Sequence, residues 1–418
     1  MSLVGELINI LLLVLTARAG IKAIFAIGQA LRAGIDPPQA DALGSGKRIV
    51  IILKVYREEA NIGEAIRYIH SVLHVFENFA AIVVGTANER VDGGDNPTLA
   101  AARREVLPGS HRIQIVEAPA DQRANAAQQL NYAVASIDSD PTKTWILTMD
   151  IDTRFSVKGV REIISYVNLN EKIIQQSGLF LANYSELSFW QKGHAIFQSR
   201  WTICHEVLRI HAHRHCRLVL AHVVGHGLCI NVGTLRLHHG FPTETFIEDI
   251  HLGFNLAGDG EVIKSCHTFD DSDNPKTLLT GLKQEYSWSY GAMLYPMYWY
   301  YYPHYATKGG GRRVVSLVLM LQGMMLHVNW LCMSWIVVGV GVLAASGSML
   351  ALCFLGIYLV DYLACIILFV RLGKFHYSQI PQAMLATCTA ILRRSLPADY
   401  ALLRLLLGMR IGRFKTSH

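Results

Sequence analysis

Two long apolar segments near the C-terminal end constrain the fold of this chain most strongly. Residues 314–345 and 349–370 are each long enough to cross the hydrocarbon core of a bilayer, which is about 30 Å thick. Only a Ser-Gly-Ser link separates them, so residues 314–370 are predicted to form a transmembrane helical hairpin. Arg312 and Arg313 precede the hairpin and more basic residues follow it, which places both of its ends in the cytosol.

Composition agrees with an integral membrane protein. Hydrophobic residues make up 51% of the 418 residues and charged residues 17%, which is too apolar for an ordinary soluble enzyme. The eight cysteines show no paired spacing, so we expect reduced thiols rather than disulfides. Near the start, residues 1–33 contain a short apolar centre at Leu7–Leu15, bounded by Arg18 and Lys22. This segment is predicted to be a transmembrane or interfacial anchor.

Residues 371–418 are predicted to form a basic, amphipathic, cytosolic tail. They contain eight lysines and arginines against a single acid, Asp399. A nucleic-acid partner is the weaker interpretation. Directly after a hairpin, such a stretch favours contact with anionic membrane lipids.

Asp361 lies near the middle of the second hairpin segment, where an ionisable group is costly and is a functional candidate by default. A structural hydrogen bond to Asn329 or His327 is the alternative that we favour slightly.

Residues 47–280 are predicted to form a soluble α/β domain. Apolar runs that are typical of buried strands alternate with amphipathic helical stretches, and the runs are residues 48–56, 80–85, 112–117 and 145–150. Asn61 and Glu64 have the spacing of a capping box at the start of the first helix. The alternation predicts a doubly wound, mostly parallel sheet, which binds its ligands at the carboxyl ends of the strands.

Asp150 and Asp152 follow the last of these runs, in the sequence "WILTMDIDTRF". A surface turn would explain two aspartates at a strand end. A carboxylate pair also suits Mg²⁺ or Mn²⁺, which prefer hard oxygen ligands and substrate phosphates. A lone D-x-D is weak evidence for a metal site. The metal-site interpretation is strengthened by other polar segments that occur in order along the chain, namely Tyr56–Glu59, residues 121–134, residues 225–260 and residues 283–293.

With these segments, residues 47–291 resemble the membrane-bound family-two glycosyltransferases, which have a GT-A fold. The resemblance implies a metal-dependent transfer of a hexose from a nucleotide sugar, with inversion. It also implies a role for each matching residue. Tyr56 and Glu58 would lie near the nucleotide, and Asp150 and Asp152 would bind the metal and the donor diphosphate. Asp249, with Glu248 beside it, would be the catalytic base, and Gln284, Ser287 and Trp288 occupy the positions of a Q-x-x-R-W motif.

The chemistry of sugar transfer agrees with these roles. A metal beside the D-x-D pair neutralises the leaving diphosphate, and a carboxylate across the pocket deprotonates the acceptor hydroxyl. Arg123 is a further candidate near the diphosphate, and Trp288 is a candidate for stacking on a sugar or base. Glu248 and Asp249 would also suit the first turn of a helix, where acids are favoured, and both interpretations can hold together.

Two departures from the family pattern concern the donor. Where relatives carry aspartates after the second strand, this chain has Gly85–Glu89, so Thr86, Asn88 or Glu89 are the candidate replacements. Ser287 stands where the motif has arginine, so one phosphate contact is either missing or supplied by another residue, for which Lys283 and Arg312 are the candidates.

Three other sequence features are candidate functional or membrane-facing segments. The sequence "HAHRHC" (residues 211–216) is a possible zinc cluster, although a solvated or headgroup-facing basic loop is favoured because no second ligand cluster matches it. His226, with Gly227 beside it, is a candidate for the acceptor or sugar pocket, with packing as an equal alternative. Residues 281–313 are rich in Tyr and Trp, which predicts helices along the membrane surface.

Together these observations predict a membrane-anchored inverting glycosyltransferase with its catalytic domain on the cytosolic side. The expected donor is a UDP-sugar, the expected metal Mg²⁺ or Mn²⁺, and the expected acceptor a lipid or lipid-linked molecule. A processive polysaccharide synthase is an alternative that would need more helices, supplied by a homo-oligomer. A non-catalytic membrane scaffold with a transferase-like domain is the other alternative.

Overall fold

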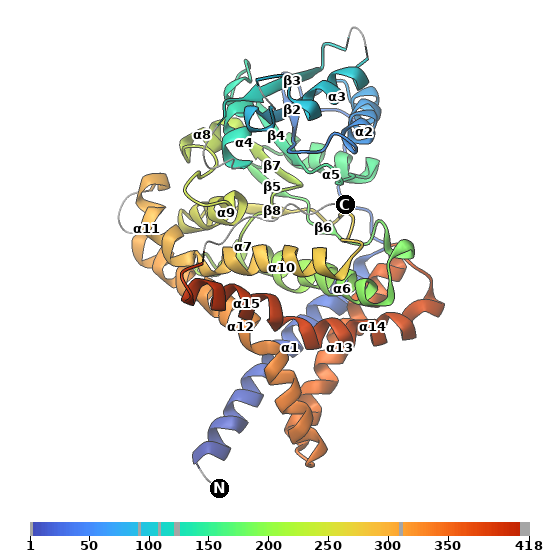
Figure 1. The fold of residues 1–418 in the computed structure, drawn as a ribbon, viewed down its shortest axis with the longest axis vertical. Coiled ribbons are helices and arrows are strands. Elements are labelled where there is room, and N and C mark those ends of the chain that lie inside the picture. The colour runs from blue at the N-terminus through green and yellow to red at the C-terminus, as the bar shows by residue number, and fades with distance from the viewer. Residues whose placement is uncertain (1–2, 91–92, 108–109, 121–125, 309–311, 410–418) are drawn as a thin grey trace.

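The computed structural model describes residues 3–90, 93–107, 110–120, 126–308 and 312–409. An α/β domain occupies one end of the molecule, and three long helices project from the other end (Figure 1). These are α1 (Leu3–Arg32), α12 (Arg313–Ala345) and α13 (Met349–Arg371). The arrangement confirms the predicted fold class.

The main sheet has, among the described residues, seven strands in the order β3-β2-β1-β4-β7-β5-β8. Their bounds are Arg48–Lys54 (β1), Phe79–Thr86 (β2), Ile113–Ala118 (β3), Thr144–Met149 (β4), Ile173–Gln175 (β5), Leu228–Asn231 (β7) and Ile263–Ser265 (β8), and β6 (Gly178–Leu179) pairs separately with β9 (Asp270–Asp271). All pairings in the main sheet are parallel except those of β7. The four predicted strands are confirmed, and β1, β2 and β4 are mostly apolar because both faces of the sheet are covered there.

Helices cover both faces of the sheet. On one face lie α2 (Ile62–Val75), α3 (Pro97–Glu105) and α5 (Val157–Asn168), and on the other α4 (Ala126–Ala135), α8 (Val232–Leu237) and α9 (Glu248–Gly258). The predicted capping box at α2 is wrong. The Asn61 side chain makes no cap hydrogen bond and donates instead to Glu58 at 3.0 Å, while Glu64 pairs with Arg154 at 2.9 Å.

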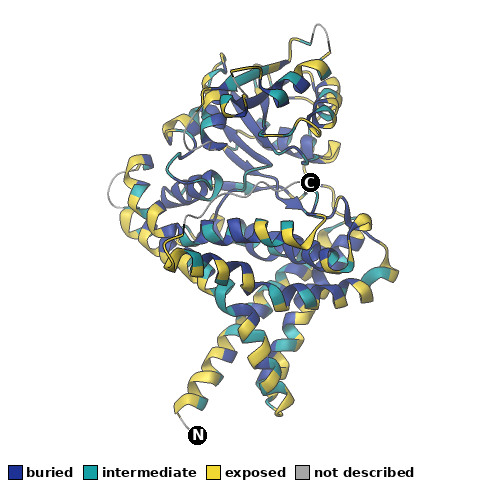
Figure 2. Cartoon of the chain, in the orientation of Figure 1, coloured by how far each residue is buried: buried dark blue, intermediate teal, exposed yellow. Residues whose placement is uncertain are grey.

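The three projecting helices are long and apolar enough to cross a membrane. The projecting ends of these helices are largely exposed (Figure 2). Their exposed side chains are apolar, for example Leu7 (57% exposed), Leu13 (57%) and Met349 (70%). Exposing so many apolar side chains to water is unfavourable, and a bilayer removes that cost. The other half of α1 packs along α13.

Further helices lie between the sheet and the projecting helices (Figure 1). They are α6 (Phe189–Trp201), a π-helical turn (Thr202–Val207), α7 (Leu208–His215), α10 (Leu278–Met293), α11 (Tyr295–Tyr305), α14 (Ile380–Arg393) and α15 (Ser395–Leu406). The aromatic segment is therefore helical as predicted, although α10 begins three residues before the expected boundary at residue 281.

Some cations of the predicted basic tail contact the rest of the protein. Arg394 is 6% exposed, Lys374 pairs with Asp271 of the α/β domain, and Arg393 donates to the Trp190 carbonyl oxygen at 3.2 Å. These cations point inward because α14 and α15 pack on α6 and α10.

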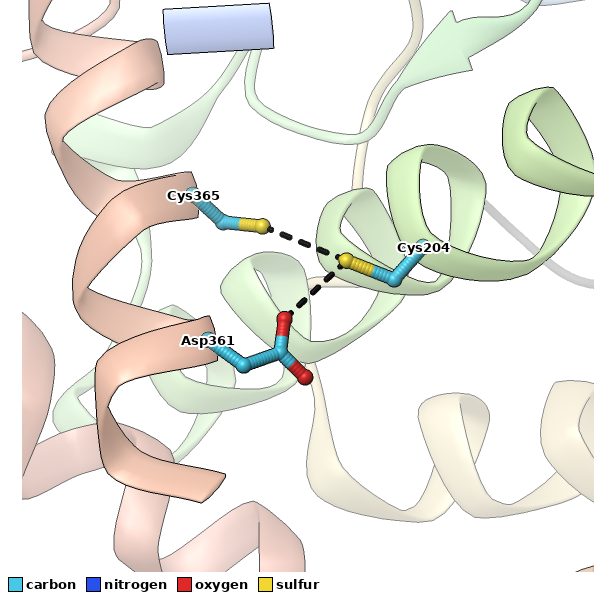
Figure 3. A group of neighbouring side chains, drawn as sticks. All are labelled: Cys204, Asp361 and Cys365. Atoms are coloured by element: carbon cyan, nitrogen blue, oxygen red, sulfur yellow. Dashed lines mark hydrogen bonds between the residues drawn. The ribbon is translucent and has the colours of Figure 1, made fainter. Parts of the chain in front are cut away.

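Asp361 is fully buried, but its predicted partners are wrong. Asn329 and His327 are not its hydrogen-bond partners. Instead it accepts from the guanidinium of Arg200 on α6, with an Nε–Oδ2 distance of 3.0 Å, and from Cys204 Sγ at 3.1 Å (Figure 3). Cys204 also lies 3.7 Å from Cys365, Sγ to Sγ. This trio is a poor cation site because a guanidinium already occupies the carboxylate.

Candidate active site

A pocket of about 710 Å³ lies between the carboxyl ends of β1 and β4 and the helix α10. The predicted residues Tyr56, Glu58, Asp150, Asp152, His226, Glu248, Asp249, Gln284 and Trp288 all line it. Because β1 and β4 are adjacent and parallel, the segments that follow them emerge at the same edge of the sheet, as in other doubly wound sheets.

Asp150 is held by a lysine that the sequence analysis did not single out. Lys54, the last residue of β1, donates to Asp150 Oδ1 at 2.6 Å and to the Gly225 carbonyl oxygen at 3.0 Å. Asp152 accepts from the Asp273 backbone N–H at 3.3 Å. The Asp150 side chain remains 38% exposed toward the pocket. The pair therefore offers hard carboxylate oxygens to the pocket, a donor set that fits Mg²⁺ or Mn²⁺.

The loop after β1 presents Tyr56 and Glu58 to the pocket. The Glu58 backbone N–H donates to Thr98 Oγ1 at 3.0 Å, and Thr98 in turn donates to Glu89 at 2.6 Å. Glu89 is 6% exposed. At the end of β2, Thr86 Oγ1 donates to Asn88 at 2.8 Å. The contacts of Thr86 and Glu89 thus stabilise neighbouring loops, and neither residue lines the pocket.

Glu248 and Asp249 form the first turn of α9, so the helix-start interpretation is correct and both acids also face the pocket. Burial and the adjacent Glu248 carboxylate raise the pKa of Asp249 to about 6, and Lys54 opposes this rise. A carboxylate with a pKa near 6 is a stronger base than an ordinary aspartate but is still ionised at neutral pH. Its Oδ2 lies 3.2 Å from the place where a Cβ on Gly225 would be.

His226 is positioned by a buried acid. Its Nδ1 lies 3.0 Å from Asp270 Oδ2. Burial alone would lower the pKa of His226, but Asp270 and the more distant Asp150 and Asp152 raise it to about 10, so the ring carries a positive charge. Gly227 adopts a φ of +67°, and a Cβ there would lie 2.0 Å from the Gln176 carbonyl oxygen. Gly227 therefore packs against the chain behind His226 instead of lining the pocket.

An aromatic wall closes the pocket beside His226. Phe180 lies 6.3 Å from the His226 ring and 5.8 Å from Trp288, between ring centroids. Phe180 gave no signal in the sequence, because one phenylalanine between a short strand and a loop resembles any core residue.

On α10, Gln284 Oε1 is buried and has no hydrogen-bond partner among the described residues, as expected of a group that awaits a ligand. Ser287 donates to the Lys283 carbonyl oxygen at 3.1 Å and so bonds within its own helix.

The expected substitutes for the motif arginine are wrong. Lys283 is exposed outside the pocket, and Arg312 packs against Gly260 at the end of α9. Arg57, after β1, lines the pocket, and so does Arg394, between α14 and α15. The position of Arg394 more than a hundred residues from Ser287 explains why a local motif could not reveal it.

One side of the pocket is formed by α6 and by the candidate membrane helix α12. Phe197 and Trp201 of α6 line it together with Leu326 and Trp330 of α12. Arg394 lies over the Phe197 ring, 5.1 Å from its centroid, and its Nε and Nη2 have no hydrogen-bond partner within the described chain. The pocket thus extends from the carboxylates at the sheet edge to apolar rings on a candidate membrane helix.

Two other predicted sites are not among the residues described as lining this pocket. Arg123 lies outside the described residues. The "HAHRHC" segment is the end of α7 and not a loop, and His213 is buried between the Val219 and Glu261 carbonyl oxygens, at 2.7 and 3.0 Å. Within the described residues these histidines form no metal-ligand group.

Sequence comparison identifies the family. The model of "Glycosyl transferase family group 2" matches residues 145–370, more than half of the chain. This protein belongs to glycosyl transferase family group 2. Family membership supports glycosyl transfer as its class of reaction. No curated protein matches the sequence at a significant level.

The chain is also similar to solved structures of glycosyltransferases. The mannosyltransferase PcManGT from Pyrobaculum calidifontis, in complex with GDP-Man and Mn²⁺, superposes with a TM-score of 0.51 at 14% identity, over 96% of this chain and 99% of the other. S. aureus TarS 1–349 with UDP-GlcNAc gives 0.40 at 10% identity over 87% and 93%. Glucosyl-3-phosphoglycerate synthase from Mycobacterium tuberculosis, with Mn²⁺, UDP and phosphoglyceric acid, gives 0.35 at 13% identity over 57% and 78%. The likeness to PcManGT shows a shared GT-A fold.

Proposed function

We propose that this glycosyltransferase moves a hexose from a nucleotide sugar, with inversion, to an amphiphilic acceptor that enters from the membrane. One observation carries the proposal: a single pocket joins Asp150 and Asp152 to Leu326 and Trp330 of a candidate membrane helix. An acceptor with an apolar tail would place its tail on α12 and its hydroxyl near Asp249.

Each residue would have a distinct role. Asp150 and Asp152 would hold Mg²⁺ or Mn²⁺, which supplies charge neutralisation for the leaving diphosphate. Lys54 would orient Asp150, and Tyr56 and Glu58 would contact the nucleotide. Asp249 would remove the proton from the acceptor hydroxyl as its oxygen attacks the anomeric carbon opposite the leaving diphosphate.

Other groups would shape the two ends of the pocket. Gln284 and Trp288 would cover the donor, and His226, as a cation, would donate a hydrogen bond to a sugar hydroxyl or phosphate oxygen. Arg394 would contact a polar group of the acceptor near the membrane. A UDP-sugar is the donor that we propose, and the GDP-Man in PcManGT makes a GDP-sugar the first comparison.

The test is donor turnover by the full-length protein in nanodiscs. UDP-, GDP- and dTDP-sugars are compared with Mn²⁺, Mg²⁺ or EDTA, with a membrane lipid extract as the acceptor source. We expect metal-dependent release of one nucleotide and transfer of its sugar to the lipid fraction. Asp152→Asn should reduce the rate by about 10²-fold or more.

The matched control is Asp138→Asn, at an exposed position before β4, which should leave the rate unchanged. Turnover that survives EDTA and Asp152→Asn would contradict the metal site. Absence of binding and turnover with every donor would contradict the transferase and favour the scaffold. Long products on a gel would instead indicate a processive synthase.

A further inference from the structure

A second cavity, of about 390 Å³, lies on the other side of the π-helical turn from the active-site pocket. Arg18 and Lys22 of α1, Arg209 of α7 and His205 of the π-helical turn line it. The two cavities share one wall, because the Trp201 ring on the active-site side stacks on His205 with 5.8 Å between ring centroids. No carboxylate is among the described residues that line this second cavity, which we call the cation cavity.

Positive charges outnumber the carboxylates around the cation cavity. Arg200 lies behind it and is neutralised by Asp361. Arg18, Lys22 and Arg209 form no ion pair within the described chain. Burial and the nearby charges of Lys22 and Arg200 lower the pKa of His205 well below its ordinary value. The His205 ring is therefore neutral, and its Nε2 can accept from Lys22 Nζ at 2.8 Å.

Arg209 has an unsatisfied hydrogen-bond donor. Its Nη1 is shielded from solvent and has no hydrogen-bond partner among the described residues. Burying an unpaired charge and leaving its N–H groups unsatisfied is costly, so such groups are normally paired. Three basic side chains without a carboxylate partner line one cavity, and one of them has an unused N–H donor, which favours a multiply accepting anion such as phosphate.

The apolar part of the cation cavity indicates where that phosphate comes from. Val14 and Ile21 line the cavity beside the cations and are 59% and 60% exposed. The helix from Leu3 to Arg18 spans roughly 22 Å at 1.5 Å per residue. Figure 1 shows α1 running from a free N-terminal end into the body of the protein. Arg18 and Lys22 fall in the second part of this helix, where Ala19 and Ala23 are buried. This is the level at which a lipid presents its headgroup to a protein and its chains to neighbouring apolar residues.

We propose that the cation cavity binds the phosphate of an anionic membrane lipid, with Arg18, Lys22 and Arg209 as its ligands. The acyl chains of this lipid would lie along Val14 and Ile21. The site is separate from the active-site pocket and does not depend on the proposed transfer reaction. A soluble phosphate shares the headgroup chemistry, and the experiment distinguishes the two sources.

The experiment uses native mass spectrometry of the full-length protein in neutral detergent. Phosphatidylglycerol is titrated against phosphatidylcholine with identical chains. We expect the first phosphatidylglycerol to bind about tenfold or more tightly than phosphatidylcholine. Arg209→Gln should remove most of this preference, while Arg32→Gln, which removes an exposed charge from the same surface of α1, should preserve it.

Further variants separate charge from folding. Arg209→Lys keeps the charge and should retain part of the preference, because lysine lacks the planar fork of arginine. If Arg209→Gln does not fold, Arg18→Gln provides the same comparison.

Three outcomes would overturn the proposal. The first is equal binding of both lipids to the unmodified protein. The second is an equal loss in Arg209→Gln and Arg32→Gln, which would indicate general surface attraction. The third is full displacement of phosphatidylglycerol by millimolar inorganic phosphate, which would indicate a site for a soluble anion.

Discussion

At the scale of single residues, the active-site pocket is a set of charges arranged around Gly225. Lys54 donates to its carbonyl oxygen, and both Lys54 Nζ and Asp249 Oδ2 lie close to the place where its side chain would begin, at 3.4 and 3.2 Å. Because glycine has no side chain, Lys54, which pairs with Asp150, and Asp249, the candidate base, can both approach this point. The reactive atoms of donor and acceptor would meet there.

Asp249 makes the pH dependence of transfer predictable. Its pKa is raised to about 6, and only the ionised form can accept a proton from a hydroxyl. We therefore expect kcat/KM to fall about tenfold per pH unit below pH 6 and to be flat just above it. The measurement is a pH profile of initial rates, with donor affinity determined separately at each pH. A flat profile down to pH 5 would show that the acceptor oxygen is already anionic, as in a lipid phosphate.

Glu206 gives a second pH effect, on stability. It is buried in the wall of the pocket, where it accepts a hydrogen bond from Ser177. Burial raises its pKa to about 7 from an ordinary value of 4.5. The folded state thus holds a proton that the unfolded state loses between pH 4.5 and 7. The free energy of unfolding falls across that window.

Glu206→Gln should remove this penalty. We expect roughly 1 to 3 kcal/mol more stability at pH 8 and almost no change at pH 4. Denaturant unfolding of the protein in detergent at the two pH values measures the difference. Equal effects at both pH values would show that packing, and not ionisation, distinguishes the variant.

At the scale of elements, α6 joins the α/β domain to the membrane-directed helices. It packs so closely on α14 that a Cβ at Gly193 would lie 2.1 Å from the Ala386 carbonyl oxygen. Backbone cannot move away as a side-chain end can, so glycine is required at this crossing. The contact fixes Arg394, just beyond α14, at the pocket.

Gly193→Ala should therefore separate α14 from α6. We expect a loss of roughly 1 to 3 kcal/mol in stability and faster proteolysis within residues 380–406. Gly28→Ala is the matched control, because nothing lies within 4 Å of a Cβ there and α1 should gain slightly from the better helix former. Equal protease resistance of both variants would contradict the close crossing.

At the scale of the whole molecule, the active site lies where the sheet edge meets the membrane-directed helices. Neither part forms the pocket alone, since β1, β4 and α9 supply its charges and α6 and α12 its apolar wall. The orientation in the membrane therefore decides which compartment supplies the nucleotide sugar.

We expect the catalytic domain to face the cytosol and the hairpin turn the opposite side. Cys216 is exposed on the α/β domain side, and Ser346→Cys would mark the turn. In variants with one cysteine each, an impermeant maleimide should label Ser346→Cys in intact cells and Cys216 only after permeabilisation. Labelling of both from the same side would show that the hairpin does not cross the bilayer.

The sequence by itself determined the hairpin, the buried strands and the D-x-D at a strand end. These features depend on local patterns, because strand burial and membrane length are visible in consecutive residues. The capping box at Asn61 failed although its spacing was correct, because Glu58 and Arg154 compete for the two side chains.

Only the tertiary structure decided which distant residues meet. Lys54 reaches Asp150, Arg394 reaches the pocket, and Arg200 neutralises Asp361. A single charged residue within an apolar segment gives no sequence pattern from which its ion-pair partner could be predicted. Burying an unpaired charge is costly, so a buried charge usually lies beside a group of opposite charge. The sequence therefore predicts that such partners exist, and the packing of helices on the sheet decides which residues they are.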